Sequence, residues 1–265
     1  MLPAQKKVLG PCLFSASRDG EEWLSGLDGK RSNRRASLAL ARVKTELRDR
    51  KTEVIVGIVR ERISSPIRRV LVVGCGSGVE AAILASELKV EVVGVDLDGS
   101  FDSAAAAAVE LRRGDATCLD FADGAFDFVF SYHVLEHIPA YRKALAEMER
   151  VLSQRGTYFV GTPNRLRLLG YLGSKDATWR DKLVWNVVDW NARLHGRFRN
   201  EYGAHAGFSP GELKAALEQV FDRTEDITLL YYLRVYQYHT GLVSLLGKLG
   251  LGGFFFPSVY FMGTK

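Results

Sequence analysis

Short β-branched runs alternate with helical patterns between residues 69 and 161, and this alternation constrains the fold more than any other feature. The runs predict five strands, at 69–73, 90–95, 109–113, 126–131 and 156–161. Helical patterns lie at 79–88, before 109 and at 139–152. Because strand–helix–strand units form parallel pairs, the pattern predicts an α/β fold with a doubly wound, Rossmann-like sheet and helices on both faces.

The flanking segments extend this sheet and add helices. A basic helical pattern over 37–63 makes residues 1–65 an N-terminal helical extension, and residues 66–265 form the main domain. Ser209, Pro210 and Glu212 are a capping signature for a helix that runs to about residue 220. Apolar runs at 227–232 and 258–263 predict the last two of about seven strands.

Charge and cysteine usage limit the classes of partner and compartment. Residues 1–69 carry 16 Lys and Arg against 8 Asp and Glu, whereas residues 70–265 carry 20 against 23. The basic extension is either a solvated helix face or a contact for nucleic acid or an anionic membrane. Three widely spaced cysteines, Cys12, Cys75 and Cys118, show no metal-site spacing and fit a cytoplasmic protein.

A glycine-rich loop follows the first strand of the alternation. It reads Gly74-Cys75-Gly76-Ser77-Gly78 and leads into the helix at 79–88. Glycines let the backbone approach a ligand, and N–H groups at a helix start favour a negative group. The dinucleotide pattern G-x-G-x-x-G would need glycine or alanine at position 79, where this chain has valine. An NAD(P)-dependent oxidoreductase is therefore the weaker of two interpretations.

The second interpretation is a resemblance to class I S-adenosylmethionine (SAM)-dependent methyltransferases. The glycine loop resembles their first motif, Val93–Leu97 the end of their second strand, and Gly114–Ala116 their adenine-side loop. The matches at 126–138, 150–152, 162–165 and 205–209 resemble the ubiquinone/menaquinone-methyltransferase-like subgroup. These motifs occur in order over residues 66–225, and the resemblance implies a strand order of 3-2-1-4-5-7-6 with the last strand antiparallel.

The resemblance implies SAM as the cofactor and a set of residues that bind it. One carboxylate can accept both hydroxyls of a ribose, and Asp96, 22 residues after Gly74, stands where the ribose is expected. Asp98 has already left the strand and suits this role less well. Asp115 would accept the adenine amino group. The predicted cofactor-binding residues are Gly74, Cys75 (through its backbone), Gly76, Gly78, Asp96, Leu97, Asp115, Ala116, Ser131 and His133.

Three histidines are candidates for a base, which an alcohol acceptor would need and an acidic phenol or enol would not. His205 matches a motif histidine of the subgroup and is the first candidate, and His137 is the second. Packing of His137 against the next helix is an alternative. No third ligand accompanies His133 and His137, so no metal site is expected.

Absent motifs narrow the class of acceptor. The Asn/Asp-Pro-Pro-Tyr motif of nucleic-acid base methyltransferases is replaced by Ser131-Tyr-His-Val, and the two-glutamate loop of protein arginine methyltransferases is missing. We therefore expect transfer to an oxygen or carbon of a small, lipid-linked or sugar-linked acceptor, and no specific nucleic acid partner. A non-catalytic, methyltransferase-like binding module is a further alternative.

An insert at 164–204 follows the fifth strand and carries Trp179, Trp185 and Trp190 within a basic helical pattern. It is expected to form a substrate lid, to lie on a membrane surface, or to pack with its aromatic side inward. The apolar segment 241–262 contains five glycines, a proline and one charge, Lys248, so we expect a short amphipathic piece and a final strand rather than a membrane span. Peripheral membrane contact through 178–199 or 241–256 is compatible with this cytoplasmic assignment.

Overall fold

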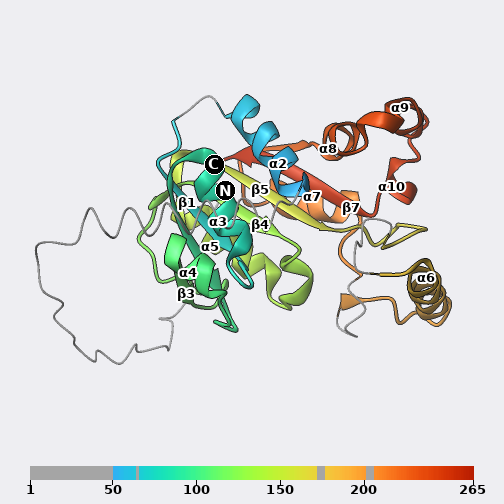
Figure 1. The fold of residues 1–265 in the computed structure, drawn as a ribbon, viewed down its shortest axis with the longest axis horizontal. Helices are drawn as coiled ribbons and strands as arrows, with labels where there is room; N and C mark the ends of the chain where they lie inside the picture. The colour runs from blue at the N-terminus through green and yellow to red at the C-terminus, as the bar shows by residue number, and fades with distance from the viewer. Residues whose placement is uncertain (1–49, 64–65, 172–176, 201–205) are drawn as a thin grey trace, which may run out of the picture.

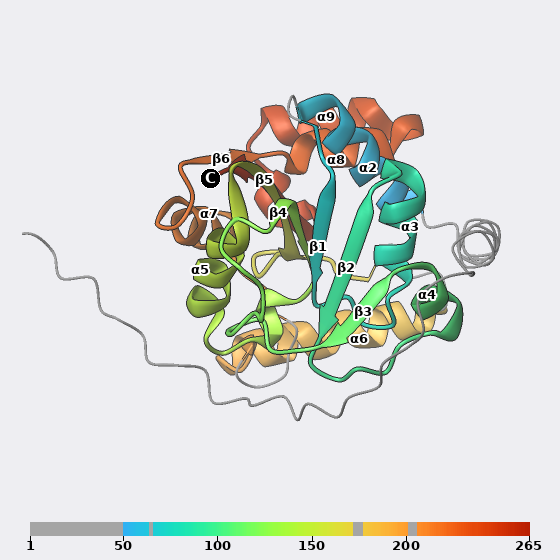
Figure 2. The same cartoon turned by 90° about the vertical axis from the view of Figure 1, so that its left-hand side faces the viewer.

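The computed structural model describes residues 50–63, 66–171, 177–200 and 206–265. A seven-stranded sheet with the order β3-β2-β1-β4-β5-β7-β6 lies at its centre, which confirms the expected order (Figures 1 and 2). β7 is antiparallel to β5 and β6, and the remaining pairs are parallel. The strands are β1 Arg69–Val73, β2 Glu91–Asp96, β3 Glu110–Arg113, β4 Phe126–Tyr132, β5 Leu152–Pro163, β6 Arg223–Asp226 and β7 Ser258–Thr264.

Helices cover both faces of the sheet, as the alternation predicted (Figure 2). α5 (Tyr141–Val151) and α7 (Pro210–Glu218) pack on one face, and α2 (Arg50–Arg62), α3 (Val79–Leu88) and α8 (Thr228–Val235) on the other. The short α4 (Ser103–Ala108) packs beside α3. The two faces of the sheet are therefore covered by apolar layers. The edge formed by the carboxyl ends of the parallel strands is left for a ligand site.

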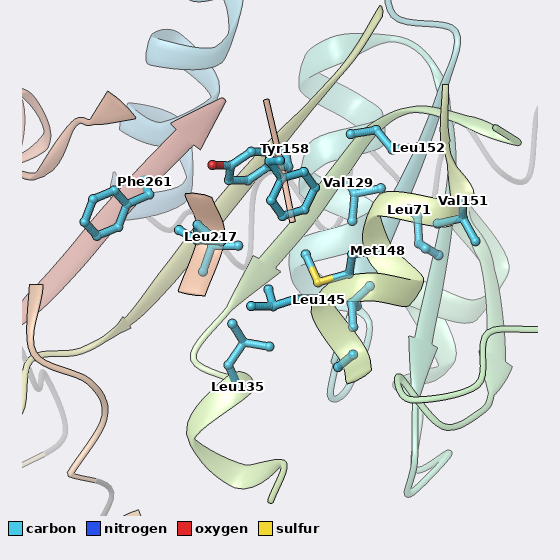
Figure 3. Packing of buried hydrophobic residues seen from close by; sticks show 14 of the residues in the cluster. Leu71, Val129, Leu135, Leu145, Met148, Val151, Leu152, Tyr158, Leu217 and Phe261 are labelled. Atoms are coloured by element: carbon cyan, nitrogen blue, oxygen red, sulfur yellow. The ribbon is translucent and has the colours of Figure 1, made fainter. Parts of the chain in front are cut away.

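The first apolar layer shows why α5 and α7 form where they do. Leu145 and Met148 of α5 point toward Leu71 and Val129 of the sheet, and Leu217 of α7 packs farther along the same layer (Figure 3). α7 begins with the predicted capping box, in which the Glu212 N–H donates to Ser209 Oγ at 3.2 Å. Such a cap contributes about 1 kcal/mol to helix stability.

The predicted strand at 227–232 is wrong. This segment begins α8, whose buried residues Thr228, Tyr231 and Tyr232 recur at helical spacing. The sixth strand is instead the preceding polar segment, Arg223–Asp226, which pairs with β7 at the edge of the sheet. An edge strand with little buried surface has no apolar alternation, and a short unbroken apolar run fits helix and strand equally well.

The C-terminal segment contains a helical piece followed by the final strand, as expected. η3 (Gln237–His239), α9 (Thr240–Lys248) and α10 (Gly252–Phe255) lead into β7. None of the helices in the described residues combines the length and the apolarity needed to cross a bilayer. Of the predicted N-terminal helix only its last part, α2, lies within the described residues.

The insert and the C-terminal helices meet beyond the carboxyl edge of the sheet. The insert helix α6 (Trp179–Leu194) starts at the capping residue Thr178, and α6, α9 and α10 lie at the same end of the molecule (Figure 1). The Leu168 N–H donates to the Phe254 carbonyl at 2.7 Å, which joins the start of the insert to α10. Asn164 Nδ2 donates to the carbonyl oxygens of Gly253 and Phe256 at 2.7 and 2.8 Å.

Candidate functional site

The glycine loop after β1 has the backbone that its sequence predicted. Gly74, Gly76 and Gly78 have φ values of +70°, +52° and +86°, a region that other residues adopt at a cost. A Cβ at Gly74 would lie 2.2 Å from Val134 Cγ2, and one at Gly78 would lie 2.4 Å from Leu111 Cδ1. A Cβ at Gly76 would meet nothing within 4 Å. The middle of the loop is therefore open on the side from which a ligand would approach.

Asp96 ends β2 directly beside this loop. Its Oδ2 accepts a hydrogen bond from the Gly76 N–H at 2.8 Å, and its Oδ1 accepts one from the Asp98 N–H at 3.0 Å. Leu97 follows with 68% of its surface exposed. The fold thus brings a carboxylate and a glycine loop together, although they are 20 residues apart in sequence.

The loop after β3 lies at the same edge. The Gly114 N–H donates to the Asp96 carbonyl at 2.9 Å. This hydrogen bond places the next two residues, Asp115 and Ala116, close to the carboxyl end of β2. Asp115 Oδ1 accepts a hydrogen bond from the Thr117 N–H at 2.8 Å. This carboxylate holds its own turn, and its second oxygen, Oδ2, remains available as an acceptor.

Cys75 faces the interior of the protein. Its side chain is buried, and burial raises the pKa of the thiol to about 12. A Cβ at Gly94 of β2 would lie 2.9 Å from Cys75 Sγ, so the thiol packs on the sheet. The Cys75 N–H donates to the Val95 carbonyl at 3.1 Å. Cys75 therefore offers backbone rather than a reactive thiolate to this site.

The end of β4 contributes Ser131, and the loop after it contributes His133. Ser131 is buried and its Oγ has no hydrogen-bond partner. His133 has a φ of +56°, and its N–H donates to the Gly161 carbonyl at 2.8 Å. His133 Nε2 lies 3.2 Å from Ser258 Oγ at the start of β7. This turned backbone aims the imidazole toward β7 and the helix α8.

A cavity of about 400 Å³ opens beside His133, and six of the thirteen residues that line it are tyrosines. Its walls include Tyr132 of β4, Tyr260 of β7, Tyr231 and Tyr232 of α8, and Tyr236 at the C-terminal cap of α8. Burial raises the pKa of Tyr132, of Tyr232 and of Tyr260, so these phenols stay neutral. Sequence reasoning missed this wall because it assigned 227–232 to a strand. The spacing of Tyr232 and Tyr236, four residues apart, was the available signal for one helix face.

Glu136 is a second residue that sequence reasoning missed. It lies in the 3₁₀ helix η1 (Leu135–His137), is 5% exposed, and its Oε2 has no hydrogen-bond partner. Burial raises the pKa of Glu136 to about 7. A carboxyl that titrates near neutrality is a candidate proton acceptor, and Glu136 interacts electrostatically with Arg167, which lines the cavity. Only its burial distinguishes Glu136 from other glutamates, and burial cannot be read from the sequence.

The two predicted catalytic histidines differ in their placement. The His137 side chain is 52% exposed, and its Nε2 lies 3.9 Å from Glu136 Oε1. His137 does not line the tyrosine cavity. His205 lies outside the described residues. Within the described part of the chain, no group of three or more His, Cys, Asp or Glu side chains is arranged to hold a metal ion.

Comparison with known proteins identifies the domain that carries this site. Residues 71–160 match the family model described as a methyltransferase domain. Residues 71–160 therefore form a methyltransferase domain, and curated proteins similar to it include SAM-dependent methyltransferases. The match spans β1 to β5 and so includes the glycine loop, Asp96, Asp115 and the loop after β4.

Relatives of this methyltransferase domain share about a third of its residues. A probable SAM-dependent methyltransferase of Mycolicibacterium smegmatis is 32% identical over 44% of this chain and 46% of its own length. Tocopherol O-methyltransferase of Arabidopsis thaliana is 32% identical over 40% of this chain and 33% of its own. The chain thus spans less than half the length of these two relatives.

A solved structure is similar over more of the chain. A SAM-dependent methyltransferase of Thermotoga maritima, described as a possible histamine N-methyltransferase, has 18% identity and a TM-score of 0.47. The similarity covers 81% of this chain and 89% of that one.

Proposed function

We propose that this protein is a SAM-dependent methyltransferase of the ubiquinone/menaquinone-methyltransferase-like subgroup, and that it methylates an oxygen or carbon of a hydrophobic acceptor. The observation that carries the proposal is the hydrogen bond of 2.8 Å between the Gly76 N–H and Asp96 Oδ2. It joins an open glycine loop to a carboxylate at the carboxyl edge of the sheet, where doubly wound folds bind ligands.

The residues at this edge fit the parts of SAM. Asp96 would accept the ribose hydroxyls, because each oxygen of its carboxylate accepts one backbone N–H, from Gly76 or from Asp98, and keeps a further lone pair for a hydroxyl. The open face at Gly76 leaves room for the backbone to approach the cofactor, and Asp115 stands next to Asp96 for the adenine. When bound, SAM supplies an electrophilic methyl group on a positive sulfonium. The protein's own task is to align the acceptor and to exclude water.

The tyrosine cavity is the proposed acceptor site. Tyr132 at the end of β4 and His133 of the following loop line it, and the next residue of that loop, Val134, packs against Gly74 of the cofactor loop. Aromatic walls favour a flat or apolar acceptor, and His133 Nε2 lies at the wall to hold a proton from a hydroxyl group. Similarity to a tocopherol O-methyltransferase supports an acceptor with a hydroxylated ring and a lipid-like tail.

The insert supplies part of the same cavity, which supports its assignment as a lid. Arg167 and Tyr171 both line the cavity from the start of the insert. Arg167 is 5% exposed and forms an ion pair with Asp189 of α6 at 3.1 Å. This ion pair connects α6 directly to the wall of the cavity. Movement of α6 would therefore change the shape of the acceptor site.

Calorimetric titration with SAM, S-adenosylhomocysteine and NADH tests the cofactor assignment. Wild-type protein is expected to bind SAM, and Asp96→Ala is expected to weaken binding by about tenfold or more, since a hydrogen bond to a charged group contributes about 1.5–3 kcal/mol. Asp98→Ala is the matched control, because it removes a neighbouring carboxylate and keeps the backbone N–H that Asp96 accepts from. Binding of NADH alone would support an oxidoreductase, and binding of neither would support a non-catalytic module.

A further inference from the structure

The insert helix α6 is amphipathic, but its polar side faces the protein and its apolar side faces outward. Its inward side is polar: Asn186 exchanges hydrogen bonds with the Gly170 backbone, Asp189 pairs with the buried Arg167, and Arg193 donates to the carbonyl oxygens of Arg165 and Arg167. The outward side is a stripe at helical spacing, each residue at least half exposed: Trp179, Leu183, Val187, Trp190 and Leu194. The expected alternative, in which the aromatic side packs inward, is therefore wrong.

A second apolar surface lies on the C-terminal helices at the same end of the molecule (Figure 1). Leu242 and Leu245 of α9 and Leu249 at its C-terminal cap are 60%, 52% and 60% exposed, and Phe254 and Phe255 of α10 are 44% and 38% exposed. Hydrogen bonds connect the two surfaces through one residue. Leu168, itself 41% exposed, donates its N–H to Phe254 of α10 and accepts at its carbonyl from Trp190 Nε1 of α6 at 2.8 Å. We call the two surfaces together the apolar end.

We propose that the apolar end docks on an anionic phospholipid bilayer and places the acceptor cavity at the membrane surface. Contiguous exposed apolar residues mark interaction sites, and a helix with Trp and Leu on one face lies in the plane of a lipid interface. Trp179 and Trp190 are suited to this position because indole rings prefer the boundary between headgroups and acyl chains. Membrane binding itself does not require methyl transfer, whereas the role of the cavity as an acceptor site rests on the proposed function.

Charge favours lipid over a protein partner. Residues 177–200 carry five Lys and Arg against two Asp; of these, Arg193 faces inward and Asp189 is buried against Arg167, so four cations and one acid remain for the outer surface. Residues 240–264 carry Lys248 and no acid. A second copy of the chain would bring the same positive rim to the contact. Residues 1–49, with ten Lys and Arg against six Asp and Glu, are also basic. An anionic bilayer is the complementary surface.

Vesicle partitioning of the full chain tests the proposal. Wild-type protein is expected to bind phosphatidylcholine vesicles that contain phosphatidylglycerol, and to bind pure phosphatidylcholine about fivefold or more less tightly, since each surface cation adds about 1 kcal/mol. Three of the four tryptophans lie in α6. Lipids brominated on their acyl chains should therefore quench the intrinsic fluorescence of the bound protein.

Substitutions on the exposed stripe locate the contact without disturbing the core. The double variant Leu183→Gln/Val187→Gln is expected to bind vesicles about tenfold or more weakly, because each side chain loses apolar area from the lipid. Leu245→Gln tests the α9 surface in the same way. Arg180→Glu should weaken binding about fivefold or more, whereas Arg155→Glu, an exposed residue near the amino end of β5, should not.

Two results would overturn the proposal. One is that wild-type protein does not bind vesicles, or that it binds them no more tightly than Leu183→Gln/Val187→Gln and Leu245→Gln do. The other is a dimer, seen by light scattering without lipid, that the double variant dissociates while vesicles bind neither protein. That second result would assign the apolar end to contact between copies of the chain.

Discussion

Replacing Glu136 with glutamine is expected to stabilise the protein at neutral and alkaline pH. The carboxyl is buried, its Oε2 has no hydrogen-bond partner, and burial raises its pKa from an ordinary 4.5 to about 7. Glutamine keeps the size and shape of the side chain and carries no charge. The substitution therefore removes the cost of burying a carboxylate.

The size of the effect follows from this pKa. Below pH 4.5 the Glu136 carboxyl is protonated in both the folded and the unfolded chain. Its burial then lowers the free energy of unfolding only a little. Between pH 4.5 and about 7 the unfolded chain loses the proton while the folded chain keeps it, so stability falls as the pH rises. The total loss is on the order of 3 kcal/mol and is complete above about pH 7.

Urea unfolding of wild type and Glu136→Gln at about pH 5 and about pH 8 measures this difference. The gain from the substitution should be larger at the higher pH by about 2–3 kcal/mol. Glu218→Gln, an exposed residue at the end of α7 that pairs with Lys214 at 3.6 Å, is the matched control and should show no such difference. Equal effects at both pH values, or a loss at the higher pH, would refute the reasoning and indicate a charged, paired carboxylate.

Three further predictions concern the loop, the insert and the cysteine. Gly74→Ala should destabilise the fold by about 2 kcal/mol or more and lower SAM affinity, measured by urea unfolding and calorimetry, because φ is +70° and Val134 lies 2.2 Å from the new Cβ. Asp189→Ala should cost about 3–5 kcal/mol in urea unfolding, because it removes the carboxylate that neutralises the buried Arg167, whereas Asp181→Ala at the exposed start of α6 should cost about 1 kcal/mol. Cys75 should resist thiol reagents in the native protein at about pH 8 and react on unfolding, because burial raises its pKa to about 12.

Local patterns in the sequence predicted much of the fold and the cofactor half of the site. β1 and α3 have the predicted bounds, because an apolar β-branched run and a glycine loop are each fixed by nearby residues. The positive φ values at Gly74, Gly76 and Gly78 follow from the same local chemistry. Asp96 was predicted from its distance along the chain, and parallel pairing of β1 and β2 brings it to Gly76.

The acceptor half of the site depends on contacts between distant segments. The tyrosine cavity exists because α8, β4 and β7 meet, and the sequence of 227–232 alone fits a strand as well as a helix. The burial of Glu136 is likewise set by neighbours that lie far away in sequence, among them Arg167. Residue patterns report the preferences of a segment, whereas a cavity is a property of several segments together.

The orientation of α6 shows this division most clearly. The sequence by itself predicted that the three tryptophans of the insert lie in a helix, since helical spacing is local, and α6 (Trp179–Leu194) confirms this. The sequence did not determine which side faces the protein. Tertiary structure decided this, because the buried Arg167 requires the carboxylate of Asp189, and satisfying that charge turns the apolar side of α6 outward.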